Sequence, residues 1–330
     1  PDDGKNFFAG NGISHMYMSD DDNLWVRTYY GIARINVVSE DITYFDDFPF
    51  ADLLASDYDS VTYLVPQGNA GLYCFNEVTA CFEKPSTQFL SSGESPKGIV
   101  YSDDGKVFFF TGSGIYILNN HVDPETGSVS LTVERKISFR IRQVSPTVHD
   151  GCCWFSDYDK RIYRLDMSDC DISLYADMSG DMPSQEKVRA LLPVDGGVYV
   201  GLSTKGLFFI SDVPGDSGKR MLSPTPVKNG VFSLMEDSRQ QIIWVGTDCG
   251  GLVRWHKGNV HFEEISYDDL RLNVRMPVRS LYLDRNNSLW CGTKGDGMIR
   301  IKDYSAYMDL NDDNVLHVTA SGSALTNDNV

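Results

Sequence analysis

The side chains that could do chemistry in this chain are numerous, but they follow no catalytic spacing. A Gly-x-Ser-x-Gly turn would expose a serine nucleophile above a sheet, and the nearest runs, 201–206 and 112–114, do not fit it. The chain has no His-Glu-x-x-His motif, no phosphate-binding Gly-x-x-x-x-Gly-Lys-Ser/Thr loop and no Gly-x-Gly-x-x-Gly turn before a helix. Its 46 acidic residues leave a glycosidase pair open, but they also make chance pairs certain. We therefore expect no catalytic residue here.

Metal ligands and thiols are also scattered. The six histidines lie far apart in the sequence, at positions 15, 121, 149, 256, 261 and 317. The runs Asp20–Asn23 and Asn311–Asn314 lack the remaining spacing of a calcium loop, and turns favour Asp and Asn anyway. The seven cysteines include no Cys-x-x-Cys pair. Cys74 and Cys81 flank a predicted hairpin turn and could form a disulfide across it; the alternative is that most of the seven cysteines are small buried residues in the sheets. We expect no metal site and no cofactor.

A noncovalent ligand site has better support. Aromatic rings stack on the apolar faces of sugars, and neighbouring amides and charges bind the hydroxyls. Side chains of these types recur in the short turns that follow β-type segments. They are Tyr29, Tyr30, Asn69, Tyr158, Lys160, Lys205, Asp248, Lys294 and Asp296.

A second set of candidate residues is basic. At equivalent positions, four β-type segments begin with Lys97, Arg142, Arg189 and Arg279. On one face these side chains would form a basic ring in an acidic protein, suited to a carboxylate or sulfate group on a ligand. The alternative is structural, with each basic side chain pairing with acids of the neighbouring repeat.

An internal repeat must position these residues. The segments Ile242–Arg254 and Leu289–Arg300 share one layout: an apolar residue and Trp, a Gly-Thr step, a Gly-containing turn, and an apolar run ending in Arg. Tracing this layout backwards gives an aromatic anchor about every 45 residues. The anchors are Trp25, Tyr63, Phe108, Trp154, Tyr199, Trp244 and Trp290. Each period contains four short runs rich in β-branched and aromatic residues, which is the signature of a β-propeller blade.

The predicted fold is all-β: one seven-bladed β-propeller of four-stranded antiparallel blades that occupies residues 1–330. Each anchor is expected on the second strand, where it packs between adjacent blades. The blades are expected at about 12–46, 51–84, 97–138, 141–177, 188–226, 231–268 and 278–320. Each terminus offers a candidate strand for closing the ring. Residues 321–330 look like the start of a following repeat, so we expect a longer protein.

Composition limits the partners. The formal net charge is −17 and the pI is about 4.6. Nucleic acid is disfavoured because phosphate neutralisation needs a basic surface, and an anionic membrane surface is disfavoured more weakly. No apolar run approaches the roughly 18 residues that span a bilayer.

One motif carries a family resemblance. Asp-x-x-x-x-Leu-Trp-x-Gly-Thr-x-x-x-Gly-(Leu/Met)-x-Arg stands at Asp284–Arg300, recurs with a one-residue shift at Asp237–Arg254, and has a degraded copy at Asp20–Thr28. It resembles the two-component regulator propeller repeat. The resemblance covers nearly the whole chain, most strongly in blades 1, 6 and 7 and least in blade 2. Propellers of that family build the periplasmic sensor region of hybrid histidine kinases, many of them glycan-responsive.

The resemblance implies a periplasmic sensor propeller that binds an oligosaccharide or transmits its signal, with no enzymatic activity in this region. It also implies a homodimer formed through the full-length sensor, membrane attachment only through segments outside this sequence, and a kinase in a missing cytoplasmic part. Two other classes stay open. One is a carbohydrate-active propeller enzyme, either a lyase or a glycosidase, which needs converging acids or histidines. The other is a protein-interaction scaffold.

Overall fold

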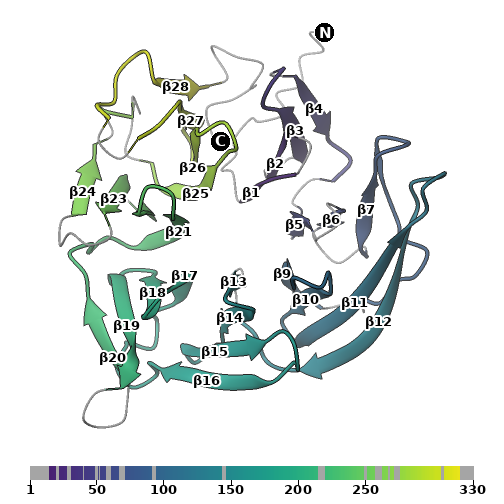
Figure 1. Cartoon of the computed structure of the whole chain (residues 1–330), viewed down its shortest axis with the longest axis horizontal. Helices are drawn as coiled ribbons and strands as arrows, with labels where there is room; N and C mark the ends of the chain where they lie inside the picture. Colours follow the sequence, from purple (N-terminus) through teal and green to yellow (C-terminus); the bar gives the residue numbers. More distant parts are fainter. Residues whose placement is uncertain are drawn as a thin grey trace. The chain divides into compact units, whose positions relative to one another are not determined.

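The fold is seen in a computed structural model that describes residues 15–19, 22–27, 31–39, 41–48, 51, 53–56, 61–66, 71–90, 94–142, 146–214, 220–248, 251–256, 262–266, 268–270, 276–305 and 308–319. All regular structure in these residues is β-strand (Figure 1). The strands form seven four-stranded sheets, each made of four consecutive strands in antiparallel order. The predicted fold, a seven-bladed β-propeller of four-stranded blades, is confirmed.

The strands of the first four blades have the following bounds. Blade 1 contains β1 (His15–Met18), β2 (Asn23–Arg27), β3 (Ile32–Asn36) and β4 (Ile42–Phe45). Blade 2 contains β5 (Leu53–Ser56), β6 (Thr62–Val65), β7 (Tyr73–Asn76) and β8 (Cys81–Glu83). Blade 3 contains β9 (Pro96–Tyr101), β10 (Val107–Thr111), β11 (Gly114–Val122) and β12 (Val129–Ser138). Blade 4 contains β13 (Thr147–His149), β14 (Cys152–Ser156), β15 (Arg161–Asp166) and β16 (Ile172–Asp177).

The last three blades follow the same order. Blade 5 contains β17 (Val188–Val194), β18 (Gly197–Leu202), β19 (Gly206–Pro214) and β20 (Arg220–Pro224). Blade 6 contains β21 (Val231–Asp237), β22 (Ile242–Thr247), β23 (Leu252–His256) and β24 (Phe262–Ile265). Blade 7 contains β25 (Val278–Leu283), β26 (Leu289–Thr293), β27 (Met298–Ile301) and β28 (Val315–Val318).

The chain divides into two compact units. One unit comprises Pro1–Phe50, Tyr199–Phe209 and Leu222–Val330, and the other comprises Ala51–Val198 and Ile210–Met221. Blades 1, 6 and 7 belong to the first unit, and blades 2, 3 and 4 belong to the second. Of the two candidate closing strands, the C-terminal one is β28, the outer strand of blade 7. The N-terminal candidate precedes His15 and lies outside the described residues.

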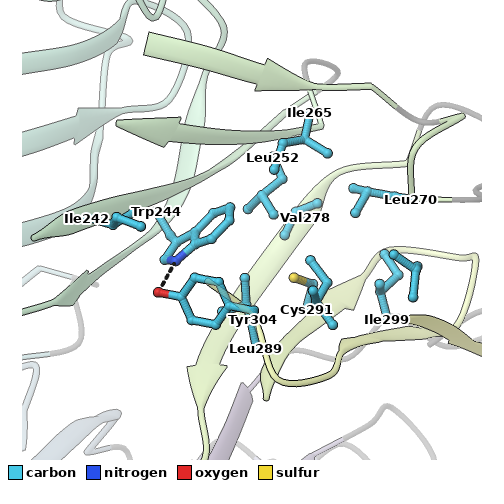
Figure 2. Packing of buried hydrophobic residues seen from close by; sticks show 12 residues of the cluster. Ile242, Trp244, Leu252, Ile265, Leu270, Val278, Leu289, Cys291, Ile299 and Tyr304 are labelled. Atoms are coloured by element: carbon cyan, nitrogen blue, oxygen red, sulfur yellow. Dashed lines mark hydrogen bonds between the residues drawn. The ribbon is translucent and has the colours of Figure 1, made fainter. Parts of the chain in front are cut away.

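In the first unit two anchors, Trp244 and Trp290, pack against the blade that follows. Figure 2 shows Trp244 of blade 6 among Val278, Leu289 and Cys291 of blade 7, and all four are buried. Trp290 of blade 7 lies in one cluster with residues of β1 and β2 in blade 1. The second unit repeats this, because Tyr63 clusters with residues of blade 3 and Phe108 with residues of blade 4. Trp244, Trp290, Tyr63 and Phe108 therefore pack between adjacent blades, as predicted.

The acid of the repeat motif holds the indole of the anchor. Asp284 Oδ2 accepts a hydrogen bond from Trp290 Nε1 at 2.8 Å, and its Oδ1 accepts one from the Ser288 backbone at 2.7 Å. In blade 6 the same link runs through a tyrosine. Trp244 Nε1 donates to Tyr304 Oη at 3.2 Å, and that hydroxyl donates to Asp237 (Figure 2 draws the first of these bonds).

The shifted spacing of the two motif copies has a local cause. Asp237 pairs with Ile242 across its turn, whereas the Asp284 amide donates to the Ser288 carbonyl. Both acids are thus opposite the residue two places before the tryptophan, and the blade 6 turn is one residue longer. The motif is the same structural feature in both blades.

The arginine that ends the motif is the cross-strand partner of the tryptophan. Trp25 stands opposite Arg34 and Trp290 opposite Arg300. The guanidinium carbon lies 5.5 Å from the ring centroid in the first pair and 4.9 Å in the second. These are cation–π distances, so Arg34 and Arg300 each lie over the tryptophan ring opposite them.

The glycine of the Gly-Thr step allows close approach of the next blade. A Cβ at Gly246 would come within 2.2 Å of Ser233 Oγ and 2.6 Å of the Val278 carbonyl oxygen. The latter atom belongs to β25, the first strand of blade 7. A side chain at this position would push the two blades apart.

The predicted turn between Cys74 and Cys81 is the β7–β8 hairpin, but these residues are not opposite each other. Cys74 pairs with Glu83, and Cys81 pairs with Asn76. None of the six described cysteines forms a disulfide, and Cys249 lies outside the described residues. Of the two possibilities left by the sequence, the disulfide is therefore not formed.

Candidate loop-end ligand site

The turns after the second strands lie beside the starts of the first strands. The amide of Asp248 donates to Gly230 O at 2.6 Å, and the amide of Lys294 donates to Pro277 O at 3.0 Å. Blade 4 has a related bond from the Arg142 amide to Ser156 O at 2.9 Å. The two sets of candidate residues therefore share one end of their own blades, called here the loop end.

In blade 4 the structure brings two candidates together and adds a third residue. Tyr158 lies in the β14–β15 turn, and 46% of its surface is exposed. The guanidinium carbons of Arg140 and Arg142 each lie 5.5 Å from the centroid of its ring. We call these three residues the Tyr158 platform. All three belong to the second unit.

A buried carboxylate shapes the turn that presents Tyr158. Asp157 Oδ1 accepts hydrogen bonds from the amides of Asp159 at 2.8 Å and Arg161 at 2.9 Å. Its Oδ2 accepts the Tyr163 hydroxyl at 3.2 Å. Such side-chain to backbone bonds fix a turn, and a buried Lys160 at φ 65° completes it. The exposed ring therefore stands on a turn held from below.

Arg140 was missed at the sequence level, although a signal for it exists. Arg140 and Arg142 flank Ile141, which is fully buried. Successive side chains of extended chain point to opposite sides, so burial of Ile141 directs both arginines away from the core. Alignment to the first-strand starts selected only Arg142.

The two guanidinium groups lack the carboxylate partners that other arginines of this acidic chain have. Arg161 lies within 3.5 Å of Asp157 and 3.2 Å of Asp177, and Arg254 donates to Glu263. In the described part of the chain, neither Arg140 nor Arg142 has an ion pair or a side-chain hydrogen bond. The platform is thus a local excess of positive charge beside an exposed ring.

The remaining candidates are dispersed. Tyr29, Tyr30 and Asn69 lie outside the described residues. Arg189, Lys205 and Lys294 are exposed, whereas Asp248 is half-buried.

Two of the turns meet in the first unit. A Cβ at Gly230 would lie 2.2 Å from Ser203 O and 3.5 Å from Asp248 Cβ. The turn that leads to Lys205 therefore lies next to Asp248.

Arg279 and Asp296 have structural neighbours. In β25 the register shifts at Arg279, which is the extra residue of a β-bulge, and its guanidinium carbon lies 5.0 Å from the Phe232 ring centroid. Lys97 in β9 and Phe232 in β21 are the extra residues at the same place. Asp296 is 3% exposed, and its carbonyl oxygen lies 2.5 Å from His317 Nε2. Asp296 therefore offers little surface to a ligand.

A polar network in blade 3 is the strongest catalytic candidate among the described residues. Glu94 accepts hydrogen bonds from Tyr116 Oη at 2.6 Å, from Lys136 Nζ at 2.9 Å and from Ser113 Oγ at 2.9 Å. Partial burial alone would raise the pKa of Glu94, but these hydrogen bonds leave that pKa lowered.

The pKa values of the two partners do not suit proton transfer either. Burial, followed by the bond to Glu94, raises the pKa of Tyr116, and the bond to Tyr116, followed by that to Glu94, raises the pKa of Lys136. A general acid or base works best with a pKa near the operating pH, and all three groups move away from neutrality. The network is therefore best explained as structural.

A cavity of about 150 Å³ lies between blade 2 and the β11–β12 hairpin, lined in part by Cys74, Asn76 and Glu83. Asn76 closes it by donating to Glu83 and to Thr126 O, both at 3.0 Å, so its amide is already used. No group of three or more His, Cys, Asp or Glu residues suited to a metal ion occurs in the described ranges.

The fold and these loop-end residues define the class: a seven-bladed β-propeller with a candidate ligand platform on its turns. No protein-family model and no curated protein sequence matches the chain. Among solved structures, the chain is similar to two extracellular domains of BT4673 from B. thetaiotaomicron, one described as a putative one component system and one as a putative hybrid two component system. The TM-scores are 0.58 and 0.57, with 18% and 16% identity over 84% and 83% of this chain.

Those matches cover 35% and 33% of the BT4673 chains, so the present chain spans about a third of their length. The chain is also similar to YCF48 from Cyanidioschyzon merolae, with a TM-score of 0.61 and 10% identity over 86% of this chain and 93% of that one. At these identities the similarity shows a shared fold.

Proposed function

We propose that this chain is an extracytoplasmic sensor propeller of a two-component system, and that it binds an oligosaccharide at the loop end without chemical conversion. The observation that carries the proposal is the Tyr158 platform. An exposed ring beside two guanidinium groups offers what a sugar needs, since the apolar face of the sugar can stack and its hydroxyls can find hydrogen-bond donors. The platform stands on a rigid turn, which lowers the cost of ordering it on binding.

The comparisons support the location and the role. The BT4673 structures are extracellular domains of a system described as putatively one component or hybrid two component. In the described parts of this chain, no helix is long and apolar enough to cross a membrane. We infer that the kinase and membrane attachment lie in other segments, and that protomers pair through the full-length sensor. Binding would then change the relation between protomers.

Calorimetric titration of the chain against neutral and acidic oligosaccharides tests the proposal, with product analysis of the same mixtures. We expect saturable heat with no cleavage, and a loss of about tenfold or more in affinity for Tyr158→Ala, since a stacked ring contributes on the order of 1–2 kcal/mol. Tyr101→Ala is the matched control, because Tyr101 is 44% exposed and lies outside the platform.

Three outcomes would count against this function. Cleavage products would replace it with an enzymatic one. An absence of heat with every oligosaccharide would remove the ligand site from this propeller. Equal losses in Tyr158→Ala and Tyr101→Ala would show that binding does not use the platform.

A further inference from the structure

We propose that the Tyr158 platform selects an anionic sugar, with the sugar ring against Tyr158 and its carboxylate or sulfate group bound by Arg140 and Arg142. This inference rests on the proposed function and adds the ligand class. It departs from the expected basic ring in two ways. The site is local to blade 4, and it includes Arg140.

The charge distribution points to an anion. The chain has 46 acidic and 29 basic residues, so a carboxylate partner for an arginine is statistically easy to find. Arg161, in the same blade, contacts Asp157, Asp159 and Asp177. The platform arginines, in contrast, have no such contact within the described ranges. Two like charges are held beside one ring, and an anionic group placed between them would relieve their repulsion.

The geometry limits the ligand to a group that combines a ring with a charge. Both guanidinium carbons lie 5.5 Å from the Tyr158 centroid, so an anion bound by them is within about one sugar ring of the tyrosine face. Guanidinium forks suit planar carboxylates and tetrahedral oxyanions alike. Uronic acids and sulfated sugars therefore share the chemistry that the platform recognises. A free inorganic anion would contact the two arginines but leave the tyrosine ring unused.

The net negative charge of the protein opposes this binding at long range. A higher affinity for an acidic sugar than for a neutral one must therefore come from contacts at the Tyr158 platform. A net charge of −17 repels an anionic oligosaccharide at a distance. Salt screens that repulsion and also the contacts that an anion would make with Arg140 and Arg142. Charge variants must therefore be compared at one ionic strength and with equal changes in net charge.

The experiment uses calorimetry with four probes: tetragalacturonate, a sulfated κ-carrageenan tetrasaccharide, neutral galactotetraose and inorganic sulfate. We expect at least one acidic oligosaccharide to bind ten times more tightly than galactotetraose, and inorganic sulfate to bind weakly. Arg140→Gln and Arg142→Gln should each weaken acidic-sugar binding about tenfold, since each removes a charge-assisted hydrogen bond. Arg135→Gln is the control, because Arg135 is exposed on β12 and its loss changes net charge equally.

The outcomes separate this inference from the proposed function. Tight galactotetraose binding with unchanged affinity in Arg140→Gln and Arg142→Gln would overturn the anionic class and leave the sensor site standing. An equal loss of acidic-sugar affinity in Arg135→Gln would show that only the change in net charge matters, and it would also overturn the inference. If no oligosaccharide binds, both proposals fail together. Arg140 is exposed and Arg142 is half-buried, and matching thermal unfolding curves establish that each variant is folded.

Discussion

The bond between Asp284 and Trp290 allows the sharpest test of how the repeat holds its blades together. Asp284 is 2% exposed, and its two oxygens accept hydrogen bonds from the Trp290 indole and the Ser288 amide. Asp284→Ala leaves both buried donors without an acceptor. A buried donor that loses its partner costs about 1–3 kcal/mol, so the two together should destabilise the chain by about 2–6 kcal/mol.

Asp284→Asn should cost less. Its amide oxygen can keep one of the two bonds, but its NH₂ group then faces the other donor. The expected loss is about half that of alanine, on the order of 1–3 kcal/mol.

Urea unfolding monitored by tryptophan fluorescence measures both variants, and Trp290 is itself one of the reporters. At a slope of about 2–3 kcal/mol/M, Asp284→Ala should lower the midpoint by about 0.7–3 M. Asp313→Ala is the control, because Asp313 is an exposed acid in a turn of the same blade. Equal midpoints for Asp284→Ala and Asp313→Ala would refute the view that the motif acid holds its anchor.

Three further predictions concern packing, pH and thiols. Gly246→Ala should lower the thermal midpoint and cost about 1–3 kcal/mol, because its Cβ would lie 2.6 Å from Val278 O; an unchanged midpoint would refute the close approach. Burial lowers the pKa of His15 to about 4, so the unfolded chain binds a proton that the folded chain does not between about pH 6.5 and 4. Stability should fall by up to about 3 kcal/mol as pH drops through that window, and urea titrations of His15→Gln should show a smaller fall. Cys81 is exposed and should react with a thiol reagent in the folded protein, whereas buried Cys153, whose pKa burial raises, should react only after unfolding.

The fold was predictable because its information is local and repeated. Each period carries its own strands, turns and anchor, so one misaligned blade does not change the architecture. In the two best motif copies, the spacing between the acid and the tryptophan differs by one residue, and the sequence alone gives no reason for this difference. It reflects one extra residue in the turn that follows Asp237, and it left the anchor and the acid in the same relation.

What the sequence could not show depends on contacts between distant or irregular segments. Tyr304 lies between β27 and β28, outside the aligned pattern, yet its hydroxyl links Trp244 to Asp237. Arg140 precedes the aligned start of blade 4 and was passed over for the same reason. Asp296 fits the pattern of a loop-end ligand residue, but the carbonyl contact with His317 on β28 and the burial of its side chain are tertiary facts.

Blade 4 departs from the repeat at the position of the motif acid, and it contains the most promising ligand residues. His149 stands where blades 6 and 7 have the motif acid, since it pairs with Cys152, two places before Trp154. In consequence the buried Trp154 Nε1 has no hydrogen-bond partner among the described residues, and the same holds for Ser156 Oγ. Each unmet polar atom costs about 1–3 kcal/mol.

Both unmet atoms lie on β14, whose end leads directly into Tyr158. Departures from structural rules are expected where a protein gives up stability for function. Buried side-chain atoms without a described partner also occur in blades 6 and 7, at Ser233, Arg279 and Ser280, so this departure is not confined to blade 4. If the blade were optimised for packing alone, an acid at position 149 would satisfy the indole, as Asp284 does in blade 7.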